Sequence, residues 1–139
     1  MAHFRIAVVE DNPPDLLVIQ RSIRDTGLDC EFTAFADGEE AIAFLSETDS
    51  QVPDLMILDF NTPRKDGPSV LNSLRSNPRW SEVAVFMFTA SQEPGNMARA
   101  AALGVDRYLI KPMNLDGFLK FGKEVQEWLE KRRSAASEE

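Results

Sequence analysis

The chain is 139 residues long, 43% of its residues are hydrophobic, and its formal net charge at pH 7 is −8. This length suits one domain, so we expect a single domain over residues 1–139, with a core at about 4–132 and a frayed tail at 134–139. The acidic charge disfavours binding to nucleic-acid phosphates, and the expected partners are proteins.

Cys30 is the only cysteine and His3 the only histidine in the sequence. One cysteine cannot form a disulfide within the chain or a cysteine-based metal cluster. One histidine makes a zinc site or a histidine nucleophile relay improbable. The sequence contains no apolar run as long as a membrane span or the h-region of a signal peptide. We therefore expect a cytoplasmic protein with no membrane contact.

Five short apolar runs predict β-strands, in chain order at residues 4–9, 30–35, 55–58, 83–88 and 105–110. Each run is almost continuously apolar and rich in Val, Ile and Phe, which is typical of strands covered on both faces. Segments with helical spacing alternate with them, as at Leu16, Ile19 and Ile23. The last helix, at about 114–132, is the longest. The alternation predicts an α/β fold with a doubly wound, five-stranded parallel sheet and helices on both faces.

Carboxylates follow two of the predicted strands. Glu10 and Asp11 come directly after the first strand, and Asp59 comes directly after the third. Ligands of such a sheet bind at the carboxyl ends of the strands, so the three acids converge if these two strands are neighbours. Two charges about 4 Å apart repel by roughly 4 kcal/mol at an effective dielectric of 20. A positive group is therefore expected among them.

Two positive groups can meet this need. Mg²⁺ takes carboxylate and carbonyl oxygens and keeps several waters, and Lys111 follows the fifth strand. Thr89, at the end of the fourth strand, adds a hydroxyl donor. Acids, a metal, a hydroxyl and a lysine together indicate a phosphate site. With no histidine or cysteine nearby, a carboxylate is the expected nucleophile, and Asp59 is the best candidate.

Four motifs carry a family resemblance: "VVEDN", "LDFNTPRKDG", "FTAS" and "RYLIKP", at the ends of strands one, three, four and five. Together and in this order they resemble the receiver domains of bacterial two-component response regulators, including the single-domain chemotaxis type. The resemblance spans roughly residues 4–132 and implies the flavodoxin-like strand order 2-1-3-4-5. "LDFNTPRKDG" is also similar to the stand-alone regulators that serve bacterial phytochromes and related kinases.

The resemblance implies a function as a stand-alone response regulator. A sensor histidine kinase would phosphorylate Asp59, with a histidine phosphotransfer protein as a further partner, and the signal would leave through protein contacts. The expected chemistry is limited to magnesium-dependent self-phosphorylation and autodephosphorylation, without enzymatic turnover of other substrates. Mg²⁺ would be bound by Asp11, Asp59 and the backbone carbonyl of Asn61, with Glu10 in support directly or through water.

The resemblance also assigns the residues around the phosphoryl group. Thr89 and Lys111 would contact its oxygens, and Tyr108 would change its packing when Thr89 moves. The bond between Lys111 and Pro112 is expected to be cis, an isomer that only proline makes accessible. Thr62 departs from the apolar residue that relatives mostly carry, which leaves the phosphoryl lifetime open.

Other interpretations of these residues remain. Glu10 and Asp11 could cap the first helix, and Tyr108 could be an ordinary core residue. A phosphohydrolase of the haloacid dehalogenase type is a second functional class, but it needs an acid where this chain has Asn61. A docking module that is never phosphorylated is a third.

The last helix offers an apolar stripe. Its sheet-facing residues are expected to be Leu115, Phe118, Gly122, Val125 and Leu129. Phe121 and Trp128 widen this stripe, either as a broad core contact or as part of a homodimer surface made by the fourth helix, the fifth strand and the fifth helix.

Overall fold

The computed structural model describes residues 3–47, 49 and 51–137. The strands are β1 (Phe4–Val9), β2 (Cys30–Phe35), β3 (Leu55–Leu58), β4 (Ala84–Thr89) and β5 (Arg107–Ile110). The helices are α1 (Pro13–Arg24), α2 (Gly38–Leu45), α3 (Gly67–Ser76), α4 (Pro94–Ala102) and α5 (Leu115–Ser137). The strands form one parallel sheet in the order β2-β1-β3-β4-β5, which confirms the predicted fold.

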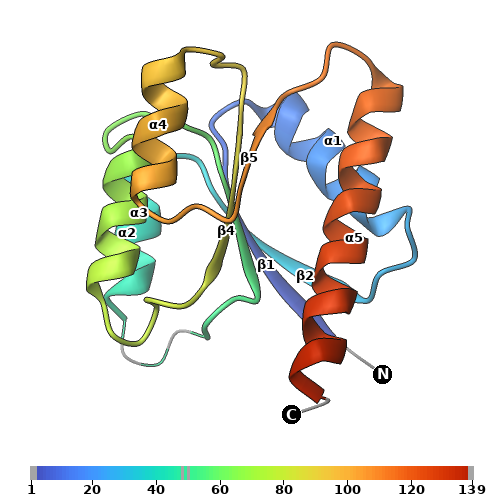
Figure 1. Cartoon of the computed structure of the whole chain (residues 1–139), viewed down its shortest axis with the longest axis horizontal. Helices are drawn as coiled ribbons and strands as arrows, with labels where there is room; N and C mark the ends of the chain where they lie inside the picture. Colours follow the sequence, from blue (N-terminus) through green and yellow to red (C-terminus); the bar gives the residue numbers. More distant parts are fainter. Residues whose placement is uncertain (1–2, 48, 50, 138–139) are drawn as a thin grey trace.

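Helices cover both faces of the sheet, with α1 and α5 on one face and α2, α3 and α4 on the other (Figure 1). Successive residues of β1 point to opposite faces, so Ile6 and Val8 join the core under α1 and α5, while Ala7 and Val9 join the core under α2 to α4. This two-sided burial explains why the central strands are continuously apolar.

Several element ends differ from the sequence prediction. β5 begins at Arg107, two residues later than predicted, and the Val105 N–H still donates to the carbonyl of Ala100 in the last turn of α4. The last helix continues to Ser137, past the predicted end near Arg132, and the Arg133 guanidinium anchors it at 3.2 Å from the Asp54 carboxylate. Of the predicted frayed tail, residues 138 and 139 lie outside the described residues.

The aromatic residues of α5 point inward. Phe121 is 4% exposed and stacks on Phe88 at 4.0 Å between ring centroids. Trp128 meets the edge of Phe86 at 5.1 Å and packs against the same core. Both side chains therefore make the broad core contact, which is one of the two interpretations of their stripe. Leu115 does not face the sheet as predicted, since it is 64% exposed and the core contact of α5 begins at Phe118.

Close packing of α1 against α5 depends on Gly122, where an added Cβ would clash with the carbonyl oxygen of Ser22. Among the described residues, no helix has both the length and the apolar character needed to cross a bilayer.

Candidate functional site

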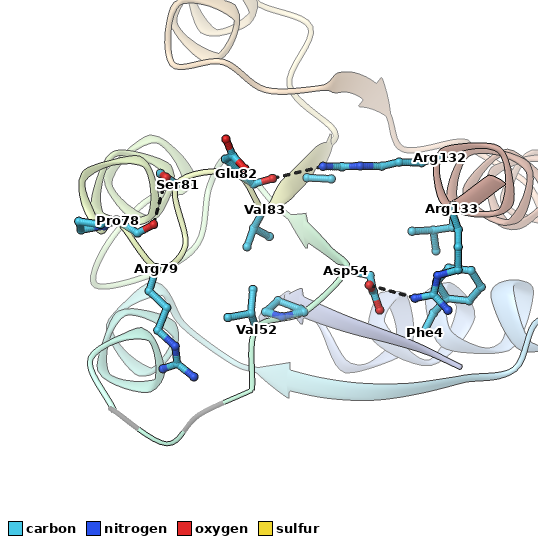
Figure 2. A pocket seen from close by; sticks show the side chains of 13 residues that line it. Phe4, Val52, Asp54, Pro78, Arg79, Ser81, Glu82, Val83, Arg132 and Arg133 are labelled. Atoms are coloured by element: carbon cyan, nitrogen blue, oxygen red, sulfur yellow. Dashed lines mark hydrogen bonds and ion pairs between the residues drawn. The ribbon is translucent and has the colours of Figure 1, made fainter. Parts of the chain in front are cut away.

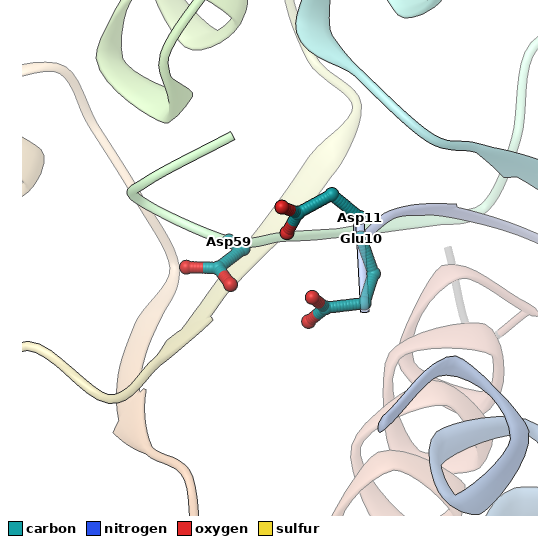
Figure 3. A group of neighbouring side chains, drawn as sticks. All are labelled: Glu10, Asp11 and Asp59. Atoms are coloured by element: carbon teal, nitrogen blue, oxygen red, sulfur yellow. The ribbon is translucent and has the colours of Figure 1, made fainter. Parts of the chain in front are cut away.

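Three carboxylates meet at the carboxyl ends of β1 and β3 (Figure 3). Val9 of β1 lies opposite Leu58 of β3 in the sheet, so the residues that follow these two positions leave the sheet side by side. One oxygen each of Glu10, Asp11 and Asp59 lies within 4.8 Å of the others. Glu10 and Asp59 are buried, whereas Asp11 is exposed to solvent.

Lys111 reaches this cluster from the end of β5. Its Nζ lies 2.7 Å from Oε1 of Glu10, 2.9 Å from Oδ2 of Asp59 and 3.0 Å from Oδ2 of Asp15. An ammonium group has three N–H donors, so each of them has a carboxylate acceptor here. The expected positive charge among the acids is therefore present in the chain itself.

Burial and charge act together on this ion cluster. Burial raises the pKa of Glu10 to about 7, and the hydrogen bond from Lys111 only partly opposes this rise. Burial alone would lower the pKa of Lys111, but the hydrogen bonds to Glu10 and Asp59 outweigh burial and hold that pKa above its ordinary value. Lys111 therefore stays protonated and positively charged, while Glu10 keeps its proton to a higher pH than an ordinary glutamate.

Asp15 is the site residue that the sequence interpretation missed. It lies in the first turn of α1, a position where an acid is common because it stabilises the helix dipole. Its contact with Lys111 joins residues 96 positions apart in the chain. No local pattern distinguishes such an acid from an ordinary first-turn acid, and only the fold brings it to Lys111.

The neighbouring residues Thr89 and Tyr108 are linked through the backbone of Ser91. The Ser91 N–H donates to Oγ1 of Thr89 at 3.3 Å, and the Tyr108 hydroxyl donates to the Ser91 carbonyl at 2.9 Å. Thr89 is fully buried and its carbonyl accepts from the Lys111 N–H at 2.8 Å. A displacement of Thr89 can therefore reach Tyr108 through one residue.

The loop after β3 is held from two sides. The N–H of Asn61 donates to Oδ1 of Asp59 at 3.1 Å. The hydroxyl of Thr62, which is buried, donates to the Lys65 carbonyl at 2.6 Å. Thr62, where relatives mostly carry an apolar residue, is therefore a buried polar side chain whose hydroxyl is hydrogen-bonded within the loop.

The alternative roles as helix caps can be judged from the hydrogen bonds. The N-cap of α1 is Asn12, whose side chain accepts from the Asp15 N–H, and neither Glu10 nor Asp11 takes that role. Glu10 does accept the N–H of Asn12 at 3.1 Å.

The peptide bond between Lys111 and Pro112 is not cis, since the described residues contain no cis peptide bond. The expectation of a cis bond was wrong for this structure, and a trans bond is the isomer that proline ordinarily favours.

A hollow of about 520 Å³ lies at the opposite end of the sheet (Figure 2). Phe4 at the start of β1 and Val83 before β4 line it, and the ion pair of Arg133 with Asp54 closes one side. The acid cluster follows the other ends of the strands. Because Glu10 and Lys111, whose pKa values are shifted, lie with the acid cluster, that edge of the sheet is the candidate functional site.

The acid cluster fits a divalent cation. Closely spaced carboxylate oxygens, such as those of Glu10, Asp11 and Asp59, are the ligands that hard cations prefer. Lys111 contacts Glu10 and Asp59, and Asp11 is the third carboxylate of this group.

Comparison with known proteins places this arrangement in a family. The model of the response regulator receiver domain matches residues 6–121. The chain belongs to the response regulator receiver family. The match includes β2 to β5, most of β1 and the edge of the sheet that carries the acids.

Relatives of this family share most of the chain. Response regulator Rcp1 of Synechocystis is 32% identical over 130 residues, covering 90% of this chain and 88% of Rcp1. A probable chemotaxis protein CheY of Rhizobium etli is 30% identical over 112 residues, covering 81% of this chain and 84% of that protein.

Solved structures agree with the fold. The phosphorylated cyanobacterial phytochrome response regulator RcpA superimposes with a TM-score of 0.85 at 31% identity, covering 92% of this chain and 94% of RcpA. The Mn²⁺-bound form of Rcp1 gives a TM-score of 0.84 at 32% identity, covering 91% of this chain and 95% of that one.

Proposed function

We propose that this protein is a phosphorylation-controlled switch in which Asp59 accepts a phosphoryl group from the phosphohistidine of a sensor histidine kinase or of a histidine phosphotransfer protein. The observation that carries the proposal is the meeting of Glu10, Asp11, Asp59 and Lys111 at one edge of the sheet. The similarity to RcpA, a phytochrome response regulator, favours a kinase of the phytochrome class. We take residues 1–139 as one receiver domain acting in the cytoplasm.

The metal in this proposal is Mg²⁺, held by Glu10, Asp11, Asp59 and the carbonyl of Asn61. When bound, the ion neutralises negative charge on the transferred phosphoryl group. The Mn²⁺-bound form of Rcp1 supports a divalent ion in a relative of this chain.

The chain's own groups perform the transfer. A carboxylate oxygen of Asp59 forms a bond to phosphorus while the bond from phosphorus to the donor nitrogen breaks, which leaves an acyl phosphate on Asp59. Lys111, already 2.9 Å from Asp59, donates an N–H to a phosphoryl oxygen. Thr89 donates its hydroxyl to another oxygen, and in the structure its Oγ1 accepts from the Ser91 N–H.

The response to phosphorylation then passes along the chain. When Thr89 turns towards the phosphoryl group, the Ser91 N–H loses its acceptor and the bond from Tyr108 to Ser91 is weakened. Tyr108 repacks, and the surface of α4 and β5 changes its affinity for a partner.

A homodimer through α4, β5 and α5 remains part of the proposal, although Phe121 is buried in the core and Trp128 is only partly exposed and packs against Phe86. Its support is the exposed apolar side chain of Ile110 beside Lys120, Lys123, Glu124 and Glu127 of α5, since mixed charges on one face can pair with their copies across a twofold axis. Light scattering tests this dimer: a monomer both before and after phosphorylation rules it out.

The function is tested by incubating the protein with acetyl phosphate and Mg²⁺. A switch gains one phosphoryl group per chain by intact mass, and the Asp59→Asn variant gains none. Sustained release of phosphate from varied phosphoesters would instead support the phosphohydrolase. If the mass of the protein with its natural sequence does not change, the third functional class, a docking module that is never phosphorylated, is supported.

A further inference from the structure

We propose that Asp15 is the positioning residue that keeps Lys111 at Asp59 when a divalent cation occupies the acid cluster. The inference rests on the proposed function, in which Lys111 must donate to a phosphoryl oxygen on Asp59. It assigns a role to a residue of α1 that makes no contribution to the predicted metal site.

The three acceptors of Lys111 are of two kinds. Glu10 and Asp59 belong to the group of carboxylates that could hold a metal ion, so Lys111 shares them with the cation. Asp15 lies outside that group and contacts Lys111 at 3.0 Å. Of these three acceptors, Asp15 is therefore the one that Lys111 does not share with the cation.

Competition for the shared acceptors makes this difference important. Glu10 and Asp59 attract Lys111 less strongly once their charge is shared with a dication, and the ammonium is itself repelled by the dication. Without another anchor, the flexible lysine side chain would turn towards solvent. Asp15 opposes this because its carboxylate remains fully available to the ammonium.

The place of Asp15 is fixed by the start of α1. Its backbone N–H is held by the side chain of the N-cap Asn12 at 3.0 Å, so the residue sits in a defined helical turn. Its side chain is 32% exposed, on the solvent side of Lys111, whereas Glu10 is 2% exposed on the inner side. The ammonium is thus held between an inner acid and an outer acid, with Asp59 as its third acceptor.

An acid in the first turn also stabilises a helix through its dipole. A loss of stability in an Asp15 variant therefore does not distinguish a positioning role from a merely structural one. The state of the Lys111 ammonium does distinguish them.

The experiment follows the Nζ protons of Lys111 by nitrogen-15 NMR in the full chain, with and without saturating Mg²⁺. The variants are Asp15→Asn, Asp15→Glu and the control Asp116→Asn, which removes an exposed acid from the first turn of α5. Lys111→Met identifies the resonance. Affinity for beryllofluoride, a phosphoryl analogue, is the second readout.

In Mg²⁺ the unmodified protein should show slow exchange of the Lys111 protons with water, and Asp15→Asn should accelerate it about tenfold. Without Mg²⁺ the acceleration should be small, because Glu10 and Asp59 still hold the ammonium. Beryllofluoride affinity should fall roughly three- to tenfold in Asp15→Asn and recover in Asp15→Glu.

Equal exchange rates for Asp15→Asn and the unmodified protein in Mg²⁺ would overturn the inference, as would the same acceleration in Asp116→Asn. The NMR readout does not depend on phosphorylation. If acetyl phosphate labels Asp59 but Asp15→Asn changes neither readout, the inference fails and the proposed function stands. If Asp59 is never labelled, the proposed function fails, whatever the exchange rates show.

Discussion

Glu10 and Lys111 form a 2.7 Å ion pair in which burial acts on the two partners in opposite senses. Burial raises the pKa of Glu10 to about 7, because a buried carboxylate prefers to be neutral. For Lys111, burial is outweighed by the hydrogen bonds that its ammonium donates to Glu10 and Asp59, and the pKa of Lys111 is raised. The metal-free protein therefore carries a permanently charged lysine beside a carboxyl group that titrates near neutral pH.

This environment predicts an unusual pH dependence of stability. Between pH 4.5 and 7, folded Glu10 binds more protons than it does in the unfolded chain, so its contribution to the free energy of unfolding falls as the pH rises. The Glu10→Gln variant does not titrate there. In metal-free buffer, its stability relative to the unmodified protein should therefore rise by roughly 1–3 kcal/mol across this window.

Urea unfolding at a series of pH values in the presence of a chelator checks this prediction. Groups that titrate in both proteins cancel in the difference. A difference that does not change between pH 4.5 and 7 would show that Glu10 titrates as an ordinary glutamate.

Removal of the Lys111 ammonium should lower the stability of the fold and strengthen Mg²⁺ binding. Lys111→Met leaves Glu10 and Asp59 buried without a counter-charge, which should cost about 3 kcal/mol of unfolding free energy in metal-free buffer. The same change should tighten Mg²⁺ binding roughly tenfold, because the ammonium no longer competes for two carboxylates. Calorimetric titration and urea unfolding measure these quantities.

Lys123→Met is the matched control, because Lys123 is an exposed lysine of α5. It should leave both quantities near those of the unmodified protein. Weaker Mg²⁺ binding by Lys111→Met would contradict the competition.

The sequence predicts part of the site at this scale. Glu10, Asp11 and Asp59 follow strands that the fold pairs, so their meeting can be expected from strand order alone. Asp15 could not be predicted, because its role depends on the path of the long Lys111 side chain, and the trans bond at Pro112 depends on a small energy difference that no local pattern sets.

Among the elements, the loop after β3 is locked against the start of α2. The Gly38 N–H donates to the Pro63 carbonyl, and a Cβ on Gly38 would clash with the carbonyl oxygen of Lys65. Arg64, at a φ of 66°, adds an ion pair with Asp37, the N-cap of α2. The loop that carries Asn61 and Thr62 is thus fixed by backbone contacts as well as side chains.

Gly38→Ala should therefore lower the free energy of unfolding by about 1–3 kcal/mol, because the clashing atoms belong to the backbone. Gly95→Ala is the matched change in the first turn of α4, where an added Cβ would have nothing within 4 Å. It should leave stability unchanged or raise it by up to about 1 kcal/mol. Thermal and urea unfolding measure the stability of both variants. Equal effects of Gly38→Ala and Gly95→Ala would show that the contact of the loop after β3 with α2 does not stabilise the fold.

The link from Thr89 to Tyr108 makes a second prediction for the elements. Tyr108→Phe removes the hydrogen bond to Ser91, worth about 1 kcal/mol, and should shift the backbone amide resonances of the loop between β4 and α4. Phosphorylation of Asp59 by acetyl phosphate should proceed as in the unmodified protein. Unchanged loop resonances would show that Tyr108 does not restrain the loop.

Sequence periodicity predicts the strands well: β1, β2 and β3 agree with the prediction residue by residue, and β4 and β5 begin one and two residues later than predicted. The end of α5 is a different case. The helix continues to Ser137, and in its last turns Arg133 makes a tertiary ion pair with Asp54 that helical spacing does not predict. Phe121 and Trp128 likewise could be placed in the core only once the position of α5 against β4 was known.

For the whole molecule, the parallel sheet separates two ends with different properties. The carboxyl ends of the strands gather the acids, Lys111 and Thr89, while the other end carries the hollow closed by Arg133 and Asp54. The fold and the family could be predicted from the order of the motifs, because four motifs at four strand ends constrain one topology. The partner and the lifetime of the phosphoryl group depend on other molecules and on solvent access, which no motif encodes.

The most direct test of the account locates the phosphoryl group chemically. The protein is incubated with acetyl phosphate and Mg²⁺, reduced with borohydride, which converts an aspartyl phosphate to homoserine, and mapped by peptide mass spectrometry. We expect homoserine at position 59 and at no other aspartate, and no homoserine when Mg²⁺ is chelated. Homoserine at Asp11 or elsewhere, or none at all, would contradict this expectation.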